Sequence, residues 1–443
     1  MTAVVCMLCV SGAMATQKNG EARYDTSGPR DPVWVKVAAE GSLPSAKAAA
    51  DFVCAGTNDQ ETIQKAIDLC SRDGRDLFLY RGIYMIDAFR EWGDGGPRAS
   101  VRLPPRRHFA LVGQGLFQAG RDMMPSATNG VVWYVRRSAW NTAAGVPSVL
   151  RGAWTKEGIQ NGAGLRLENL SIFICDAQHP ARCVDLRRTD GVEVRNMRLR
   201  GMGERCMMGD SFPYEKFGPL PMPHIDSIGI TMTSGSNLHV SRFDNIHATG
   251  FGQAFQAGGE HVICCDCLAS FNLYGWTFGN YDYTCGFNHP IVLINCGDEQ
   301  SVHLPLFAKC GDDGGAKHGM QSVTMVGFNF ERVPEKIIGR KIGHGMRETR
   351  PGTWRGHIEY TMQPAWHATN SVHQALWEED GSGSGFETRN LAHKRIGTSE
   401  ERRKYYPQMG QQYFDIDLGR LLICTDPAKR KWVDAMGTPA DRP

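Results

Sequence analysis

The stretch LENL at residues 167–170 is the first of six similar stretches that decide the fold. In each stretch an apolar residue or a glycine lies two positions before a central Asn or Asp, and an apolar residue follows directly after it. The other five are VRNM at 194–197, FDNI at 243–246, CCDC at 264–267, LINC at 293–296 and GFNF at 327–330. The central residues are, in chain order, Asn169, Asn196, Asn245, Asp266, Asn295 and Asn329.

The spacing of these stretches predicts a parallel β-solenoid. The intervals between central residues are 27, 49, 21, 29 and 34, and we interpret the interval of 49 as two coils of about 24 residues each. A period in the twenties with one strand-like motif per repeat is typical of stacked coils. Outward neighbours also match in charge, because Arg166 would stack on Glu193 and Glu168 on Arg195.

The apolar pattern predicts a corner at each central residue. Side chains alternate between the two faces of a straight strand. Residues two before and one after the Asn can therefore both face the core only if the chain bends at the Asn. We expect the Asn side chain to point inward and to bond the coils above and below, which would satisfy turn backbone.

Composition fits a globular protein and offers no electrostatic case for nucleic acid. Lys and Arg total 49 against 47 Asp and Glu, a formal net charge of +2 over 443 residues. This balance speaks against a nucleic-acid partner and against a polybasic membrane contact. The chain has 51 glycines, against roughly 31 at average usage of about 7%, which indicates many turns between short strands.

The beginning of the chain resembles a secretory signal. Residues 3–10, AVVCMLCV, form an apolar run, and Ala13-Met14-Ala15 has the small-x-small pattern of a signal-peptidase site. No basic residue precedes Lys18, so the signal is atypical. We expect residues 1–15 to be a signal peptide and the protein to be secreted, periplasmic or at the cell surface. The run is too short to span a bilayer, so we expect no membrane insertion.

The 14 cysteines are expected to be mainly reduced, buried thiols. The CxxC at 264–267 has no second CxxC at zinc-finger spacing, so a metal site there is not expected. Cys175 and Cys183 are close enough along the chain to pair.

An amphipathic helix is predicted before the repeats. Within NDQETIQKAIDLCSRDG at 58–74, Ile63, Ala66, Ile67 and Cys70 form the i, i+3, i+4, i+7 stripe of a helix. Asn58 or Asp59 is a candidate N-cap.

This region carries a resemblance to a known group. DFVCAGTNDQETIQKAI followed by LYRGIYMI resembles the N-terminal cap and first coil of right-handed parallel β-helix proteins of the pectate-lyase-like superfamily. The resemblance covers residues 50–335 and implies an all-β, right-handed parallel β-helix with an N-terminal helical cap, placed at residues 30–336. The group includes glycoside hydrolases, polysaccharide lyases, epimerases and phage tailspikes, so the fold alone does not fix the reaction.

The remaining residues, 337–443, are expected to form an irregular C-terminal region. The repeat fades there into a sequence that includes GSGSG at 381–385. The end, YFDIDLGRLLICTDPAKRKWVDAMG at 413–437, predicts short strands around an Asp-Pro turn, a terminal β-hairpin. It resembles the closing hairpins of bacterial surface and phage-tail proteins.

Candidate catalytic groups come from carboxylates at equal offsets from the central residues. Asp185 lies 16 residues after Asn169, and the same offset in three consecutive later coils falls on acidic residues. These are Glu260, Asp282, and Asp312 with Asp313 beside it, which follow their central residues by 15, 16 and 17 positions.

The expected spacing of these carboxylates suits two kinds of chemistry. Strands stack about 4.8 Å apart, so the groups would lie about 5 or 10 Å from each other. Such pairs supply an acid beside a base, as in glycosidases, or bind calcium, as in a lyase. Solvated turn carboxylates are the plain structural alternative.

Further residues near this column are candidates for substrate binding. Aromatic rings in YGWTFGNYDY would offer flat faces to sugars, and basic or imidazole groups lie close by in phase or sequence. They are Trp276, Tyr281, Tyr283, His261, Lys317, His318 and His344.

A second resemblance supports part of this set. CGDDGGAKHG at 310–319 resembles the paired-aspartate motif of polygalacturonase-type hydrolases, and Gly343-His344-Gly345 and Thr189-Asp190-Gly191-Val192 resemble two other motifs of that family. It implies Asp312 and Asp313 as acids and His344 as a substrate-side histidine. Asp190 is not retained, because over a hundred residues separate it from Asp312 where the family has neighbouring coils.

The sequence therefore predicts a carbohydrate-active enzyme, a glycoside hydrolase that acts on a polysaccharide or oligosaccharide without a cofactor. A calcium-assisted lyase or epimerase, with Lys317 or an Arg as base, is the first alternative. A non-catalytic, tailspike-like glycan-binding adhesin is the second. Flat flanks of the coils would also suit a homotrimer. No GxSxG, GxxxxGK[ST] or helix-opening GxGxxG motif is present.

Overall fold

The computed structural model describes most of the chain between residues 33 and 440. The described residues are 33–105, 108–115, 130–154, 160–175, 178–187, 189–201, 223–234, 240–259, 261–278, 290–299, 301, 306–307, 321–332, 345–348, 354–364, 376–377, 385–390, 396–404, 407, 410, 412–426 and 428–440. The expected signal segment, 1–15, lies outside them. Among the described residues no helix is long and apolar enough to cross a membrane.

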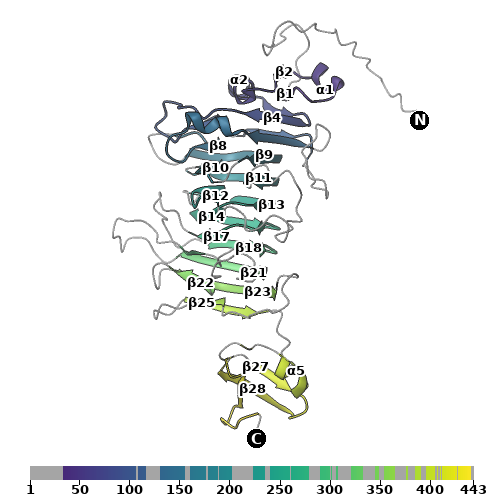
Figure 1. The fold of residues 1–443 in the computed structure, drawn as a ribbon, viewed down its shortest axis with the longest axis vertical. Coiled ribbons are helices and arrows are strands. Elements are labelled where there is room, and N and C mark those ends of the chain that lie inside the picture. Colours follow the sequence, from purple (N-terminus) through teal and green to yellow (C-terminus); the bar gives the residue numbers. More distant parts are fainter. Residues whose placement is uncertain are drawn as a thin grey trace, which may run out of the picture.

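Two large sheets carry most of the described residues (Figure 1). The sixteen-stranded sheet contains β1 (Trp34–Ala38), β2 (Phe52–Val53), β3 (Asp76–Leu79), β4 (Gly82–Ile86), β6 (Ala110–Gly113), β7 (Val131–Val135), β9 (Gln160–Ile174), β11 (Thr189–Arg200), β13 (Ser241–Thr249), β15 (Val262–Cys265), β16 (Leu268–Ser270), β18 (Pro290–Ile294), β19 (Gly297–Glu299), β21 (Gln321–Arg332), β23 (Trp354–Pro364) and β25 (Gly385–Asn390). The nine-stranded sheet contains β5 (Ala99–Arg102), β8 (Ser148–Arg151), β10 (Ala181–Asp185), β12 (Ser227–Ser234), β14 (Gln253–Gly259), β17 (Tyr274–Phe278), β20 (Leu306–Phe307), β22 (Gly345–Glu348) and β24 (Leu376–Trp377).

Both sheets are built from parallel pairs that join one coil to the next. In the sixteen-stranded sheet β9 pairs with β11 and β11 with β13, and in the nine-stranded sheet β10 pairs with β12 and β12 with β14. The chain therefore alternates between the two sheets and advances by one strand at each return. This arrangement is a parallel β-helix, as the repeat pattern predicts.

The predicted corners are present, with the side chains on the opposite side from that expected. Asn169, Asn196, Asn245, Asp266 and Asn295 all have left-handed backbone, with φ between 51° and 57°. The apolar residues two before and one after each of them are buried. The five polar side chains themselves are half-buried or exposed, so the expectation of inward Asn residues was wrong.

The corner side chains bond to one another along the outside of the coils. The Asn196 amide donates to Asn169 Oδ1 at 3.1 Å, and the Asn245 amide donates to Asn196 Oδ1 at 2.8 Å. Asn295 donates in the same way to Asp266 Oδ1 at 2.6 Å. The bonding between neighbouring coils that the sequence predicts therefore exists, but at the surface.

Two assignments within the repeat need correction. Ile294 pairs with Val326 and Gly297 with Asn329, so the corner that follows Asn295 is Gly327, with φ 66°, and Asn329 lies beyond it. The interval of 49 residues is one coil, because β11 pairs directly with β13.

Charged residues on the outside of the sixteen-stranded sheet alternate as predicted. Arg166 pairs in register with Glu193, and Glu168 with Arg195. Arg195 also lies 3.1 Å from Glu193 and 3.6 Å from Asp244 of the next coil. Because these side chains are partly exposed, each ion pair contributes only about 0–1 kcal/mol.

The parallel stack extends beyond the boundary expected near residue 337. β23 pairs with β21 and β25 pairs with β23, so coils continue to Asn390. A separate four-stranded sheet follows, with β26 (Ile396–Gly397), β27 (Gln412–Asp415), β28 (Arg420–Asp426) and β29 (Lys431–Asp434), beside helix α5 (Ser399–Lys404).

The coils enclose one continuous apolar core. Helix α2 (Asp59–Asp73) adds its predicted stripe to this core, since Ile63, Ala66, Ile67 and Cys70 are fully buried and α2 packs on β1, β3, β4 and β5. A short helix α1 (Pro44–Ala48) and a 3₁₀ helix (Arg137–Thr142) are also present.

The described cysteines are free thiols. Cys175 and Cys183 therefore do not form the disulfide that their spacing allowed. Cys264, Cys267 and Cys296 are buried in the core, and burial raises their thiol pKa. These three residues act as small hydrophobic side chains, as predicted.

Candidate functional site

Most of the predicted site residues lie outside the described part of the chain. Only Trp276 and His261 belong to described segments. The others are Glu260, Asp282, Asp312, Asp313, Tyr281, Tyr283, Lys317, His318 and His344.

The strands that precede the predicted acids are nevertheless described, and they are neighbours. β14, β17 and β20 are adjacent parallel strands of the nine-stranded sheet. Their register matches Ala257 with Phe278 and Phe278 with Phe307. The chain segments that follow these three strands therefore leave the same edge of the sheet.

Asp185 and the three later acids occupy different sequence positions relative to the matched strand residues. Glu260, Asp282 and Asp312 follow their matched strand residues by three, four and five positions. Asp185 lies within β10 and pairs with Thr231, so it is not level with the other three. The equal offset that the sequence suggested for Asp185 was wrong, because coil lengths differ.

The structure corrects the expectation for Trp276. Its ring is fully buried, stacks on Phe255 with ring centroids 4.3 Å apart, and donates from Nε1 to the Gly297 carbonyl at 3.0 Å. It fills the core and has no face to offer to a sugar. His261 is half-buried, has a left-handed backbone with φ 52°, and accepts from the Ser241 amide through its carbonyl.

His247, which the sequence analysis did not single out, does not serve as an acid near neutral pH. Its Nε2 lies 3.0 Å from Ser270 Oγ and 3.1 Å from Thr249 Oγ1. Burial, together with the charges of Arg198 and Arg200, lowers its pKa to about 3. A neutral ring that bonds two hydroxyls supports the sheet rather than proton transfer.

A column of polar side chains runs along the outer side of the nine-stranded sheet. Its members follow directly after core residues such as Leu150, Val184 and Phe255, so they point away from the core. They pair in register from coil to coil, and all except the first are buried. The column consists of Arg102, Arg151, Asp185, Thr231, Gln256 and Thr277.

The middle of this column is an ion cluster around Asp185. Arg187 donates from Nε and Nη2 to the two carboxylate oxygens at 2.9 and 2.8 Å, and Ser148 donates at 2.9 Å. Burial opposes ionisation, but the charges and hydrogen bonds of Arg187, with Arg182 and Ser148, hold the pKa of Asp185 well below its usual range. Asp185 is therefore a permanently ionised structural anion.

The far end of the column consists of neutral groups that bond one another. Thr277 donates to Gln253 Oε1 at 2.8 Å, and Thr231 donates to Gln256 Oε1 at 3.2 Å. Gln253 in turn donates to the Ile225 carbonyl at 3.1 Å. These buried amides and hydroxyls extend the polar column to β14 and β17, the strands that precede Glu260 and Asp282 in the sequence.

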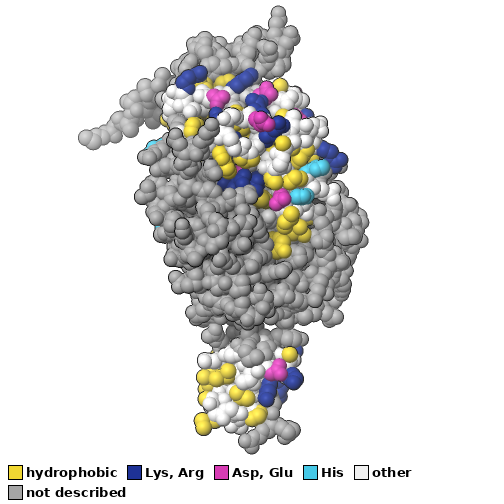
Figure 2. Space-filling view, turned by 90° about the vertical axis from the view of Figure 1, so that its left-hand side faces the viewer, with side chains coloured by type: hydrophobic (Ala, Val, Ile, Leu, Met, Phe, Trp, Pro, Cys, Tyr) yellow, Lys and Arg dark blue, Asp and Glu magenta, His cyan; other side chains and the backbone are white. Residues whose placement is uncertain are grey.

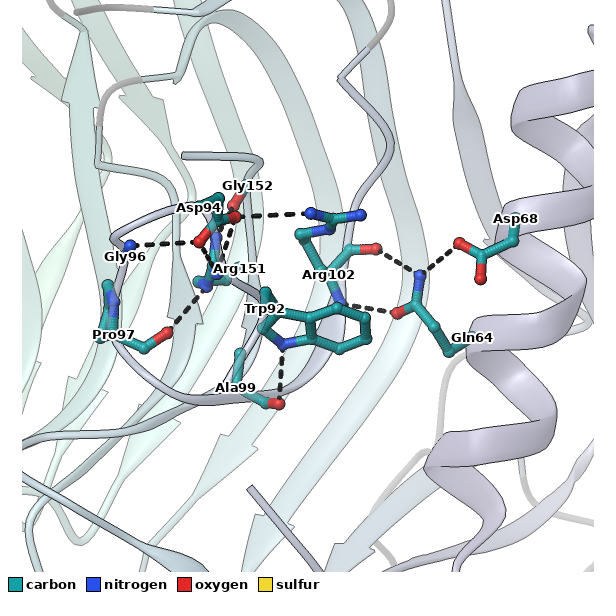
Figure 3. A network of polar contacts seen from close by, with 10 residues as sticks. All are labelled: Gln64, Asp68, Trp92, Asp94, Gly96, Pro97, Ala99, Arg102, Arg151 and Gly152. Atoms are coloured by element: carbon teal, nitrogen blue, oxygen red, sulfur yellow. Dashed lines mark hydrogen bonds and ion pairs between the residues drawn. The ribbon is translucent and has the colours of Figure 1, made fainter. Parts of the chain in front are cut away.

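At its N-terminal end the column carries an ion pair shared among three residues (Figure 3). Arg151, fully buried, donates from Nη2 to both oxygens of Asp94 at 2.7 and 2.9 Å. Arg102 Nη1 lies 3.5 Å from Asp94 Oδ2. Burial raises the pKa of Asp94, but the bonds from Arg151 and Gly96 outweigh this effect and lower it.

Trp92 and Gln64 hold Arg102 in place. The Arg102 guanidinium lies over the Trp92 ring, with Cζ 5.0 Å from the centroid, and Trp92 Nε1 is fixed by the Ala99 carbonyl at 3.0 Å. Gln64 of α2 accepts from the Arg102 amide at 2.8 Å and donates to the Arg102 carbonyl at 3.1 Å. Gln64 also donates to Asp68 at 2.9 Å (Figure 3).

A small pocket opens beside this network, between α2 and the end of β5. Its volume is about 210 Å³, and Asp68, Ser71, Arg72 and Arg102 contribute polar atoms to its lining. Sequence reasoning missed it because Gln64 and Arg102 are 38 positions apart and belong to no motif. The polar pair Gln64 and Asp68, four apart on the helix beside the apolar stripe, was the one signal available.

The described part of one face of the molecule carries no dominant charge. In Figure 2, which shows the left-hand side of Figure 1, basic, acidic and apolar side chains are interspersed over the described part. Among the described residues, no group of three or more His, Cys, Asp or Glu could hold a metal ion.

Comparisons with known proteins give only a distant likeness. No protein-family model matches the chain, and no curated protein sequence matches it. The product of open reading frame 18 of Geobacillus virus E2 has 9% identity and a TM-score of 0.38, over 72% of this chain and 55% of that one, so the chain spans about half the length of the viral structure.

Two further solved structures are of carbohydrate-active enzymes. The catalytic domain of a GH87 α-1,3-glucanase in complex with tetrasaccharides has 11% identity and a TM-score of 0.30, over 83% of this chain and 70% of that one. The A-module of a mannuronan C-5 epimerase from Azotobacter vinelandii has 12% identity and a TM-score of 0.30, over 75% of this chain and 96% of that one.

Proposed function

We propose that this protein cleaves a polysaccharide by hydrolysis, with its acid and base among Glu260, Asp282, Asp312 and Asp313. The observation that carries the proposal is the register of β14, β17 and β20, because three neighbouring parallel strands lead into the three segments that hold these carboxylates. Strands of one parallel sheet are about 4.8 Å apart. Acids that follow such strands at similar offsets are candidates for a working pair.

The chemistry needs one carboxyl group protonated and one ionised. The first donates a proton to the glycosidic oxygen as the bond breaks, and the second either activates water or attacks the anomeric carbon. Like-charge repulsion between neighbouring carboxylates raises one pKa and so supplies this division of roles. Export, with residues 1–15 as a signal peptide, and assembly as a homotrimer are further parts of the proposal that suit an extracellular glycan substrate.

A polysaccharide screen tests the proposal. The purified chain is incubated with plant, algal and host polysaccharides, and both new reducing ends and the absorbance of unsaturated uronate are measured. We expect reducing ends without that absorbance, no effect of EDTA, and a loss of at least about a hundredfold in Asp312→Asn, because acid–base catalysis contributes 10²–10⁴-fold.

The matched control and the other outcomes separate the alternatives. Asp298→Asn changes a carboxylate buried within the coils, and thermal unfolding of this variant and of Asp312→Asn separates a loss of folding from a loss of activity. Absorbance of unsaturated uronate that EDTA abolishes would replace hydrolysis by a calcium-assisted lyase reaction. Glycan binding without any product would favour the alternative that the protein is a non-catalytic, glycan-binding adhesin.

A further inference from the structure

The pocket between α2 and β5 has room for one small ligand. Its volume is about 210 Å³, and it is partly open to solvent, so a single sugar residue can enter it. The pocket belongs to β5, four strands from β14 in the sheet order, so it lies about 19 Å from the edge discussed above.

Arg102 presents a fixed cationic group to this pocket. Its guanidinium is held over Trp92, with Cζ 5.0 Å from the ring centroid, and one terminal nitrogen faces Asp94 at 3.5 Å. Figure 3 shows the other terminal nitrogen on the side of α2, toward Asp68. A planar guanidinium held in this way suits an oxyanion such as a carboxylate.

The carboxylate that faces Arg102 is already committed elsewhere. Asp94 accepts two short bonds from Arg151 and a third from the Gly96 amide at 3.1 Å. One carboxylate therefore serves two guanidinium groups, and Arg102 is the more distant partner. Among the described residues, the charge of Arg102 is therefore only partly compensated.

The described charges around the pocket leave a small positive excess. Among the residues that the structure describes, four basic groups stand against three acidic ones, a difference of one positive charge: Arg72, Arg75, Arg102 and Arg151 against Asp68, Asp73 and Asp94. The C-terminal end of α2 contributes roughly half a negative charge. A single negative charge on a ligand is therefore favoured, and a highly charged ligand is not.

The same groups argue against a bound cation. A calcium ion takes six to eight oxygen ligands. Three described carboxylates lie around the pocket. Asp73 pairs with Arg75 at 3.0 Å. Asp94 is engaged by Arg151 and Gly96, and Asp68 accepts one hydrogen bond from Gln64 at 2.9 Å.

The remaining lining fits the rest of a sugar. Asp68 accepts hydrogen bonds, Ser71 both donates and accepts, and both are exposed. Sugar hydroxyls need both kinds of partner. Pro105, which is exposed, adds apolar surface for the C–H face of a pyranose ring.

From these observations we propose that this pocket binds one acidic sugar residue, with its carboxylate on Arg102, assisted by Arg72, and its hydroxyls on Asp68 and Ser71. The inference is independent of whether the chain cleaves glycans, because it uses only the donors, acceptors and size of the pocket. It gives the protein a second contact with a uronate-containing glycan, on β5, four strands from β14.

Calorimetric titration of the full chain tests the site with three probes: sodium D-galacturonate, D-galactose and inorganic phosphate. We expect galacturonate to bind with a millimolar Kd, and the two other probes to bind at least about tenfold more weakly. The variant Arg102→Gln should lose at least about tenfold in affinity for galacturonate, because one charge-assisted carboxylate contact is removed.

Arg90→Gln is the matched control. Arg90 also lies over the Trp92 ring, at 5.5 Å, and also pairs with a carboxylate, Glu61, at 3.0 Å, but it does not line the pocket. We expect its affinity for galacturonate to stay within about twofold of the unchanged chain. Equal losses in both variants would overturn the proposal.

Two further outcomes are decisive. Galactose or phosphate binding as tightly as galacturonate would overturn the assignment to an acidic sugar, and so would the absence of any binding. Asp312→Asn separates this site from the proposed reaction. It should lower the rate of cleavage by at least about a hundredfold and leave the affinity of this pocket for galacturonate unchanged.

Discussion

At the scale of single residues, the coil corners show what a sequence pattern can and cannot fix. Apolar residues on both sides of Asn196 require a bend, and the bend is present because Asn tolerates left-handed backbone. The direction of the Asn side chain does not follow from that pattern. Gly327 takes the same conformation without any polar marker, and this is why Asn329 was assigned in its place.

Substitution of Asn196 separates backbone strain from the side-chain ladder. Asn196→Ala should lower the free energy of unfolding by about 2–5 kcal/mol, because it adds left-handed strain of roughly 1–2 kcal/mol to the loss of two hydrogen bonds of about 0.5–1.5 kcal/mol each. Asn196→Gly should lose the hydrogen bonds alone. Urea titration of both variants measures the difference, and equal losses would show that φ contributes nothing.

At the scale of elements, the polar column on the nine-stranded sheet could not be read from the sequence. Arg151, Asp185 and Thr231 pair in register, although the numbers of residues that separate them along the chain are unequal. Offsets counted from the corner residues therefore do not predict which residues pair, and Asp185 is an example. The α2 stripe, by contrast, was predictable because it depends on local periodicity alone.

The Asp185 cluster makes stability depend on pH in a defined direction. The pKa of Asp185 is lower in the folded chain than in the unfolded chain, where it is about 3.9. Its contribution is therefore complete above about pH 4 and is lost as the pH falls below that value. Asp185→Asn should cost about 3–5 kcal/mol at neutral pH, because the buried Arg187 would lose its bidentate carboxylate partner.

Thermal unfolding between pH 3 and pH 7 measures this effect. The unchanged chain should lose stability on acidification, and Asp185→Asn should show a flatter profile over the same range. Asp226→Asn is the control, since its carboxylate is exposed and lies 3.9 Å from His224 only. A parallel shift of all three profiles would contradict the role given to Asp185.

At the scale of the whole molecule, the stacking order of the coils follows from the repeat, but their number and lengths do not. The interval between Asn196 and Asn245 contains a single coil, since β11 pairs directly with β13. Stacking constrains only the residues that pair between coils. The number of residues between one strand and the next therefore varies without a pattern. The predicted acids fall in such segments, which is why the sequence orders them but does not place them.

The C-terminal sheet has its own small core, and this leads to a prediction about the whole chain. Tyr413, Leu422, Cys424 and Trp432 form a cluster that shares no residue with the core of the coils. Within it, Arg402 and Asp415 form a buried ion pair at 2.9 Å.

Because coils of a solenoid are stabilised mainly by their nearest neighbours, truncation after Asn390 should change the free energy of unfolding of the coils by less than about 0.5 kcal/mol. In the full chain, Trp432→Ala should raise hydrogen exchange in β27, β28 and β29 and leave exchange in β9, β11 and β13 unchanged. A four-residue core supports little stability by itself, so this unit should also open first on heating. A truncated chain whose coils unfold at markedly lower temperature would show instead that the C-terminal sheet protects the open end of the stack.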